Sequence, residues 1–324
     1  AFRDPEVERL RQRVTYEVEQ LIGAISPTCL PEWSSARPAF FSKRASSVAL
    51  SSDGALLACM AEDCGIQLVE AATLRVVRYL GGEPSGVVGR VAYSPTGRLV
   101  GYWDNTRLRL YELATGEEIA AIAGYDNEPT LSNVDSLAFS HDTMRIAIGT
   151  LDGELFVWER AGAAHAVRTD VTAGGRISCL AFSPDDSLLA AGSEDGGVWL
   201  LNLKEGGEVR KVSGDLEGTG VPCRALAFSP DGGEIFGGRE DGKISTWSTA
   251  GLTETATFEL DAEGITCMRL DSDGTRLAVG TSRGTCLVLD LSTRRHTSLP
   301  APHDTAVGDL AFSVDEKSLV SEIG

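Results

Sequence analysis

Short apolar segments alternate with polar, turn-forming residues along most of the chain, and the same pattern returns at nearly equal intervals. The clearest copy lies between Leu180 and Gly196, where an apolar segment, a Ser-Pro-Asp-Asp turn, a second apolar segment and a Glu-Asp-Gly turn follow one another. Short apolar segments bounded by Pro, Asp and Gly are typical of β-strands joined by tight turns. This copy therefore predicts a pair of antiparallel strands.

The pattern occurs in seven copies, and each copy contains a serine at the first turn. These serines are Ser52, Ser94, Ser140, Ser183, Ser229, Ser272 and Ser313. Neighbouring serines are 41 to 46 residues apart. A period of about 40–45 residues is typical of a β-propeller in which each repeat forms one four-stranded blade. We therefore expect an all-β fold, a seven-bladed propeller that spans residues 38–324.

The second half of each copy predicts two further strands. The third strand ends on a bulky residue five places after the glycine of the second turn, at Trp158, Leu201, Trp247 and Leu289. A fourth strand follows, as at residues 256–260.

These units resemble WD40 repeats, and the resemblance covers roughly residues 40–324. The Trp-Asp pair of the family is degenerate here and reads Tyr111-Glu112, Trp158-Glu159, Leu201-Asn202, Trp247-Ser248 and Leu289-Asp290. The Gly-His pair of the family is missing, and His303-Asp304 is its nearest counterpart. The resemblance implies a non-catalytic scaffold for protein–protein interaction, a subunit of a larger multiprotein assembly. Two alternatives are a regulatory or sensor propeller domain of a larger enzyme and a structural component of the axoneme or cytoskeleton.

The seventh copy stops at Gly324, after its second strand. A closed ring needs outer strands for this blade, because open sheet edges invite pairing with other chains. In the WD40 family the N-terminal segment commonly supplies the outermost strand, so the resemblance implies that a strand near residues 39–43 closes the last blade. The abrupt end and the start at Ala1 are also compatible with a fragment of a longer protein.

The first 37 residues follow a different pattern. Asp4 is suited to cap a helix and Pro5 to its first turn. Apolar residues then recur at steps of three and four, at Val7, Leu10, Val14, Val18, Leu21 and Ile25. This spacing predicts an amphipathic helix over residues 4–25, followed by a proline-containing tether. The apolar stripe either packs on the propeller of its own chain or docks on another protein.

Composition limits the partners. The 324-residue chain carries a formal net charge of −18, which disfavours direct binding of nucleic acid and of anionic membrane surfaces. No apolar run is long enough to insert into a membrane. The seven cysteines include no C-x-x-C pair, and Cys179, Cys223 and Cys267 fall in or just before the first strand of a repeat. We expect buried, reduced thiols and a cytoplasmic protein, with a cytoskeletal or ciliary location as an alternative.

Motifs for catalysis are missing from the sequence. The four histidines have no partner at metal-binding spacing, and no nucleophile elbow, P-loop or kinase signature occurs. Residues 271–274 resemble the start of a calcium loop but lack the glutamate that completes one, and nothing completes a zinc site at Cys59 and Cys64. We expect no enzymatic activity, no bound metal and no cofactor.

Recognition by a propeller is expected in its loops. The loops between blades and the turns after each second strand should share one face. On that face Trp103 is a candidate aromatic anchor, Arg239 and Arg283 occupy comparable turns, and Asp135 and Arg224 lie at strand starts near the central channel. The competing interpretations are that Trp103 packs against the neighbouring blade and that the charged residues form solvent-exposed salt bridges with acids such as Glu240.

Overall fold

The computed structural model describes residues 45–51, 55–61, 65–70, 75–81, 90–103, 107–123, 134–160, 167–169, 171, 173–204, 208–212, 220–260, 264–299, 305–312 and 319–323. The predicted helix at residues 4–25, its tether and the predicted closing strand near residues 39–43 lie outside these ranges. Every regular element within them is a β-strand, and no helix that could cross a membrane is found there.

The strands form seven antiparallel sheets, which we number in chain order. Sheets 1 to 3 comprise β1 (Ala45–Leu50), β2 (Leu56–Ala61), β3 (Gly65–Glu70) and β4 (Arg75–Leu80); β5 (Val91–Tyr93), β6 (Leu99–Trp103), β7 (Arg107–Glu112) and β8 (Glu118–Ala123); β9 (Val134–Phe139), β10 (Arg145–Thr150), β11 (Leu155–Glu159) and β12 (Val167–Arg168). Sheets 4 and 5 comprise β13 (Ile177–Phe182), β14 (Leu188–Ser193), β15 (Val198–Asn202) and β16 (Glu208–Lys211); β17 (Cys223–Phe228), β18 (Glu234–Arg239), β19 (Lys243–Ser248) and β20 (Glu254–Glu259). Sheets 6 and 7 comprise β21 (Ile265–Leu270), β22 (Arg276–Thr281), β23 (Cys286–Asp290) and β24 (Arg295–Ser298); β25 (Val307–Phe312) and β26 (Leu319–Ile323).

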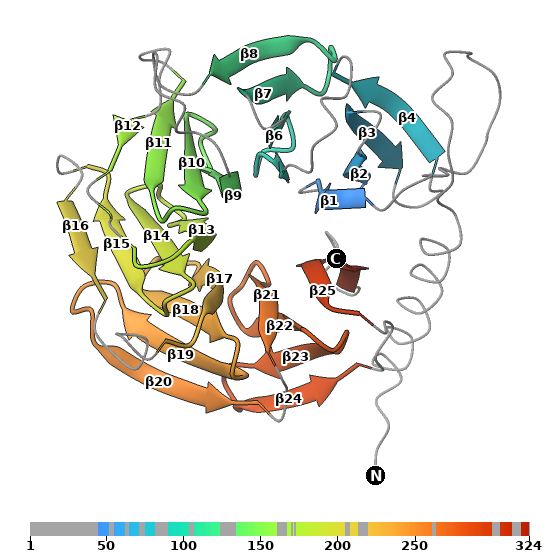
Figure 1. Ribbon diagram of the computed structural model, residues 1–324. Helices are drawn as coiled ribbons and strands as arrows, with labels where there is room; N and C mark the ends of the chain where they lie inside the picture. Colours follow the sequence, from blue (N-terminus) through green and yellow to red (C-terminus); the bar gives the residue numbers. More distant parts are fainter. Residues whose placement is uncertain are drawn as a thin grey trace.

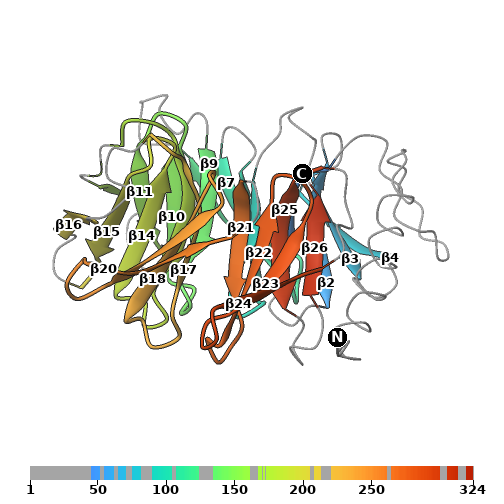
Figure 2. The same ribbon diagram turned by 90° about the horizontal axis from the view of Figure 1, so that it is seen from below.

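The sheets are arranged in a circle around a central axis. The first strand of each sheet lies nearest the axis and the fourth lies at the rim (Figure 1). Seen from the side, the sheets stand next to one another with their inner strands running roughly along the axis (Figure 2). The all-β prediction is confirmed, and the arrangement is that of a WD40-like β-propeller.

Buried apolar side chains of the described residues form six clusters, each lying between two successive sheets. One cluster, for example, joins Leu108 of sheet 2 to Ile146 and Phe156 of sheet 3. The bulky residues predicted at the ends of third strands belong to these clusters and are buried: Trp158, Leu201, Trp247 and Leu289. Each sheet is thus stabilised by the faces of its neighbours, as expected of repeats that cannot bury their apolar surface alone.

The serine at the first turn fixes that turn by two kinds of hydrogen bond. In sheet 4 the Ser183 hydroxyl accepts the N–H of Leu188 at 2.9 Å and donates to the Asp185 carboxylate at 2.8 Å. In sheet 5 the Ser229 hydroxyl makes the same two bonds, to Glu234 and Asp231. These short side-chain bonds occupy backbone groups that the tight turn leaves unpaired.

Two of the predicted serine positions are one residue wrong. In sheet 1 the turn is closed by Ser51, the residue before the predicted one, whose hydroxyl accepts the N–H of Leu56 at 2.9 Å. In sheet 6 the same position is held by Asp271, whose carboxylate accepts the N–H of Arg276 at 2.9 Å, and not by Ser272. In sheet 6 the sequence register failed because a carboxylate can replace the hydroxyl as acceptor. In sheet 1 it failed because two consecutive serines fit the pattern.

A glycine in the second strand sets how closely successive sheets approach. Four sheets have glycine at this position, at Gly149, Gly192, Gly238 and Gly280. A Cβ atom placed on Gly149 would lie 2.5 Å from Cγ2 of Ile177, the first residue of the next sheet, and one on Gly280 would lie 2.8 Å from Cγ1 of Val307. The inner strand of the following sheet therefore packs directly on the glycine backbone.

Hydroxyl groups add a hydrogen bond across the same junction. Ser136 of sheet 3 donates to the carbonyl of Ile177 at 2.7 Å, and Thr266 of sheet 6 donates to the carbonyl of Val307 at 2.6 Å. Between sheets 4 and 5, Ser178 donates to the carbonyl of Cys223.

We expect Gly149→Ala to lower the free energy of unfolding by about 2 kcal/mol, because the added methyl group must displace the first residue of the next sheet. Urea unfolding of both proteins measures this difference. The matched control is Gly175→Ala, whose added Cβ meets its nearest atom at an ordinary 3.4 Å. Equal stability of the two variants would show that the glycine is not needed for this packing.

The first turns of sheets 3 and 4 are clamped together by Asp186. Its carboxylate accepts the backbone N–H of His141 and that of Asp142, both at 2.8 Å, and lies 2.9 Å from Nδ1 of His141. The position of His141 is proline in sheets 4 and 5, which has no N–H to satisfy. Asp186 itself has φ of 55°, at the position where Gly232 has φ of 70°.

The hydrogen bonds of Asp186 to His141 and Asp142, which we call the clamp, therefore stabilise the fold by more than the left-handed backbone of Asp186 costs. We expect Asp186→Ala to lower the free energy of unfolding by about 2 kcal/mol, since it removes the acceptor and keeps the left-handed backbone. Asp186→Gly also removes the acceptor but relieves the backbone, so it should be about 1 kcal/mol more stable than Asp186→Ala. A glycine variant more stable than the wild type would mean that the clamp contributes less than the strain costs.

Candidate interaction site

One end of the sheets brings together the two kinds of loop that were expected to share a face. The residue after the second strand donates its N–H to the residue that precedes the first strand of the same sheet. Glu194 bonds Arg176 at 3.0 Å, and Glu240 bonds Pro222 at 3.0 Å. The same bond joins Ser282 to Gly264. In these three sheets the bonds hold the start of the first strand beside the end of the second strand. We call the surface at this end of the strands the loop face.

Six charged side chains form a continuous line across the loop face, which we call the charged network. It runs from sheet 2 to sheet 5 and alternates in sign: Arg90, Asp135, Arg176, Glu194, Arg224 and Glu240. Three arginines and three acids leave it without net charge, in a protein whose formal net charge is −18.

The ion pairs of the network differ in length. Arg224 Nη2 lies 2.9 Å from a carboxylate oxygen of Glu240 within sheet 5. The pairs between sheets are longer, with Arg90 at 3.4 Å and Arg176 at 3.8 Å from Asp135. Glu194 lies between Arg176 at 3.5 Å and Arg224 at 3.6 Å. The Nε atom of Arg176 is buried and makes no hydrogen bond to the described residues, so charge attraction alone holds it there.

Exposure in the network varies from one member to the next. The side chains of Arg90, Glu194 and Glu240 are about half exposed, whereas that of Asp135 is 13% exposed. Pairs of this kind contribute roughly 0–1 kcal/mol each to stability, because water screens them.

A neighbouring carboxylate on the same face is bound within its own turn. Burial raises the pKa of Asp195, but hydrogen bonds from Ser193 and from the N–H groups of Gly197 and Gly174 outweigh this effect. The pKa of Asp195 therefore lies below its usual value, and the residue stays ionised at neutral pH.

The structure brings two of the predicted site residues together. Asp135 and Arg224 belong to the charged network, at the starts of β9 and β17. The alternative interpretation of Arg224, a salt bridge with Glu240, is also what the structure shows. Arg283 lies in the turn after β22 and is exposed, and it is outside the network.

The prediction that Trp103 is exposed on a turn was wrong. Trp103 is the last residue of β6 and is 1% exposed. Val100 pairs with Tyr93 as Ile146 pairs with Phe139, so Trp103 is equivalent to Gly149. Its indole lies in the cluster between sheets 2 and 3, as the competing interpretation proposed.

The prediction that Arg239 is exposed was also wrong. Arg239 is the last residue of β18 and is 4% exposed, and its Nη2 atom lies 3.3 Å from Asp241. The equivalent residues Thr150, Ser193 and Thr281 are buried as well, because this end of the second strand points into the sheet interface.

Sequence reasoning missed three members of the network: Arg90, Arg176 and Glu194. Their positions, just before a first strand or just after a second one, were available from the repeat pattern. The ion pairs between them could not be predicted, because residues of different sheets are far apart in the sequence.

No cluster of three or more metal-ligating side chains is found in the part of the chain that the structure describes. The described cysteines, at positions 59, 179, 223, 267 and 286, are unpaired by disulfides and buried. This confirms the expected burial of Cys179, Cys223 and Cys267.

The sequence comparisons support the same family as the fold. The profile of the "WD domain, G-beta repeat" matches residues 167–201 and 210–248. The chain is similar to "Guanine nucleotide-binding protein subunit beta" of Solanum tuberosum, with 30% identity over 40% of this chain and 34% of the relative. For the Oryza sativa subsp. japonica protein of that name, identity is 31% over 42% of this chain and 36% of the relative.

A more distant similarity is to "Periodic tryptophan protein 2 homolog" of Schizosaccharomyces pombe, with 28% identity over 40% of this chain and 15% of the relative. The chain thus matches about a third of the length of its guanine nucleotide-binding relatives. With the strand arrangement, these matches support a divergent member of the WD40-repeat family. They also support an interaction scaffold.

The buried position of Trp103 leads to a stability prediction. We expect Trp103→Ala to lower the free energy of unfolding by about 3–5 kcal/mol, because loss of the indole leaves a cavity between sheets 2 and 3. Trp103→Phe should lose less, since most of the apolar volume is kept. The control is Tyr79→Ala, which removes a side chain that is 59% exposed and should change stability by less than about 0.5 kcal/mol. Unfolding in urea distinguishes the variants, and a Trp103→Ala protein as stable as the wild type would contradict the buried assignment.

Proposed function

We propose that the protein is a non-catalytic WD40 scaffold that binds a partner protein through the charged network on its loop face. The proposal includes seven blades over residues 38–324, one for each sheet, and contact between β1 and β25 is what closure of the ring requires. It also includes a role as a subunit of a larger cytoplasmic assembly, in keeping with relatives that are named as subunits.

The observation that carries the proposal is the unbroken alternation of charge across four sheets. Exposed ion pairs of this length add little to folding, so stability alone does not account for five of them in one line. At an interface, alternating charge selects a partner with the complementary pattern and fixes its orientation. Arginine is suited to this role because its planar group binds carboxylates in a defined geometry.

The ion pairs of the network can also be replaced by ion pairs to another protein at a small cost in free energy. Its inter-sheet pairs are 3.4–3.8 Å long, so an incoming carboxylate can form a shorter bond to Arg90 or Arg176 than the present one. The half-exposed Glu194 and Glu240 can accept from a basic side chain in the same way. The partner that fits is a protein surface with both acidic and basic residues in register with these four.

The N-terminal residues 1–37 are proposed as a second contact region, through the apolar stripe from Val7 to Ile25. Two contact regions on one chain would allow it to bridge two other subunits.

The proposal predicts that reversing one ion pair abolishes binding without affecting the fold. In the double variant Arg224→Glu with Glu240→Arg the internal pair is kept, but the charges presented to a partner are exchanged. We expect proteins co-purified with the tagged wild type and identified by mass spectrometry to fall at least about tenfold in this variant, the effect of roughly 1.4 kcal/mol. Its melting temperature should stay within about 2 °C of the wild type.

The matched control reverses a pair at the opposite end of the sheets. Arg145 lies 2.9 Å from Glu159, at the start of β10 and the end of β11. Arg145→Glu with Glu159→Arg should keep the co-purified proteins. Retention of all partners by the Arg224 and Glu240 variant would eliminate the loop face as the binding surface, and equal loss in both variants would indicate a non-specific effect of charge.

A further inference from the structure

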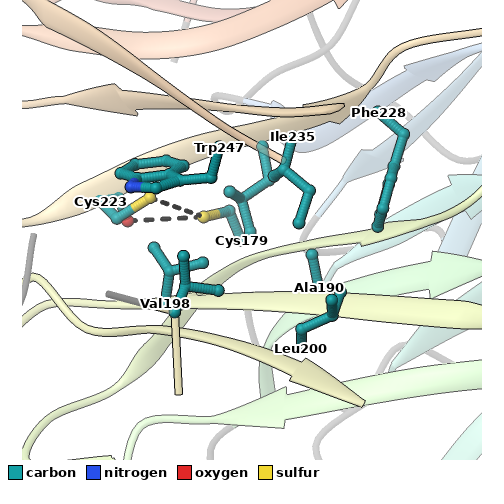
Figure 3. Close-up of a cluster of buried hydrophobic side chains, with 10 residues drawn as sticks. Cys179, Ala190, Val198, Leu200, Cys223, Phe228, Ile235 and Trp247 are labelled. Carbon is teal, nitrogen blue, oxygen red and sulfur yellow. Dashed lines mark hydrogen bonds between the residues drawn. The ribbon is translucent and has the colours of Figure 1, made fainter. Parts of the chain in front are cut away.

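Two cysteine thiols from neighbouring sheets face each other across the junction between sheets 4 and 5. Cys179 is the third residue of β13 and Cys223 is the first residue of β17. Their sulfur atoms are 3.9 Å apart, and the sulfur of Cys179 is 3.4 Å from the carbonyl oxygen of Cys223. Figure 3 shows the two sulfurs pointing toward each other beside Trp247 and Val198.

The close approach has a structural cause. Gly192 pairs with Cys179 in the sheet, and a Cβ placed on Gly192 would lie 2.6 Å from the sulfur of Cys179 and 2.8 Å from that of Cys223. The two sulfurs therefore occupy the space that a side chain at position 192 would fill. Ser178 donates a hydrogen bond to the carbonyl of Cys223, which holds the two backbones together at this point.

Sheet 6 provides an internal comparison. Cys267 of β21 pairs with Gly280, as Cys179 pairs with Gly192, and its sulfur lies 3.8 Å from the carbonyl of the next inner strand. The residue that provides this carbonyl is Val307, where sheet 5 has Cys223. The geometry of the junction is thus general, whereas a thiol on both of its sides is a feature of sheets 4 and 5 among the described ranges.

We infer that Cys179 and Cys223 are a redox pair, which a peroxide converts into a disulfide that ties sheet 4 to sheet 5. The first thiol, as thiolate, attacks the peroxide oxygen and becomes a sulfenic acid, with release of one water for hydrogen peroxide. The second thiol then attacks that sulfur and releases a second water. Two thiols lose two protons and two electrons in total, and hydrogen peroxide is reduced to two waters.

The two thiols are near enough to form a disulfide, but their burial slows their reaction with an oxidant. A disulfide requires the sulfurs to move from 3.9 Å to about 2.05 Å, and they already face each other in the space next to Gly192. Both residues are buried, and desolvation raises the pKa of Cys179 well above its usual value. The thiol form dominates at neutral pH, so oxidation is slow in the closed structure and proceeds through transient opening of the junction.

The inference is independent of the proposed binding function, and its test uses the full chain. The reduced protein is treated with hydrogen peroxide in its native buffer, and free thiols are blocked under denaturing conditions. Digestion without reductant should yield one linked peptide containing Cys179 and Cys223, 2 Da lighter than the sum of its two free peptides and separated by dithiothreitol. Low, non-denaturing urea should speed its formation by exposing the pair.

Matched variants identify the pair. Cys223→Ser and Cys223→Ala should each abolish the linked peptide, whereas Cys267→Ser should leave its yield unchanged. The oxidised wild type should melt several degrees above the reduced protein, and Cys223→Ala should show no such increase. Recovery of Cys179 and Cys223 as blocked free thiols after prolonged peroxide, with and without urea, would overturn the inference. So would their conversion to sulfinic or sulfonic acids without a linked peptide.

Discussion

The structure depends on one repeated constraint: in four of the described sheets the second strand contains a glycine, and the inner strand of the next sheet packs on its bare backbone. The glycine in the second strand makes this possible, since any side chain at Gly149 or Gly280 would meet the first residue of the next sheet. A hydroxyl of the preceding inner strand then bonds the carbonyl at the same point, as Ser136 does to Ile177. Close packing and a satisfied carbonyl together set the spacing of the sheets around the axis.

The junction between sheets 2 and 3 departs from this rule in a consistent way. Trp103 takes the position of the glycine, and its indole is buried among the apolar side chains of both sheets. A large side chain at that point requires more room between the two inner strands than glycine does. The junction between sheets 2 and 3 is thus filled by an aromatic group instead of by direct backbone contact.

The repeat period was sufficient to predict the strands, the turns and the buried ends of the third strands, because those features depend on local sequence and on the alternation of apolar residues. It could not predict which side chains meet across a junction. Trp103 looked like a turn residue beside Asp104, and its register with Gly149 becomes visible when the pairing of β6 with β5 is known. Asp271 was missed because its carboxylate accepts the hydrogen bond that a serine hydroxyl accepts in other sheets.

The charged network was beyond sequence reasoning for the same reason. Asp135 and Arg176 are 41 positions apart in the chain, and their contact exists because two inner strands converge near the axis. The thiols of Cys179 and Cys223 meet through the same convergence. Close spacing near the axis therefore places unrelated side chains within a few ångströms, and the chemistry at each junction depends on which residues happen to stand there.

Acidic side chains in this chain are held in two different ways, and the difference separates those that build turns from those that link sheets. At the first turns, Asp185 accepts hydrogen bonds from Ser187, Lys204 and Ser183, which hold its pKa far below the usual value. That carboxylate is part of the turn, because three of these bonds come from Ser183 and Ser187, which lie within the turn itself. On the loop face, Asp135 and Glu194 instead lie between arginines of different sheets at 3.4–3.8 Å. These longer contacts can break without loss of any turn bond, so the proposed recognition and the folding of the turns depend on different acidic residues.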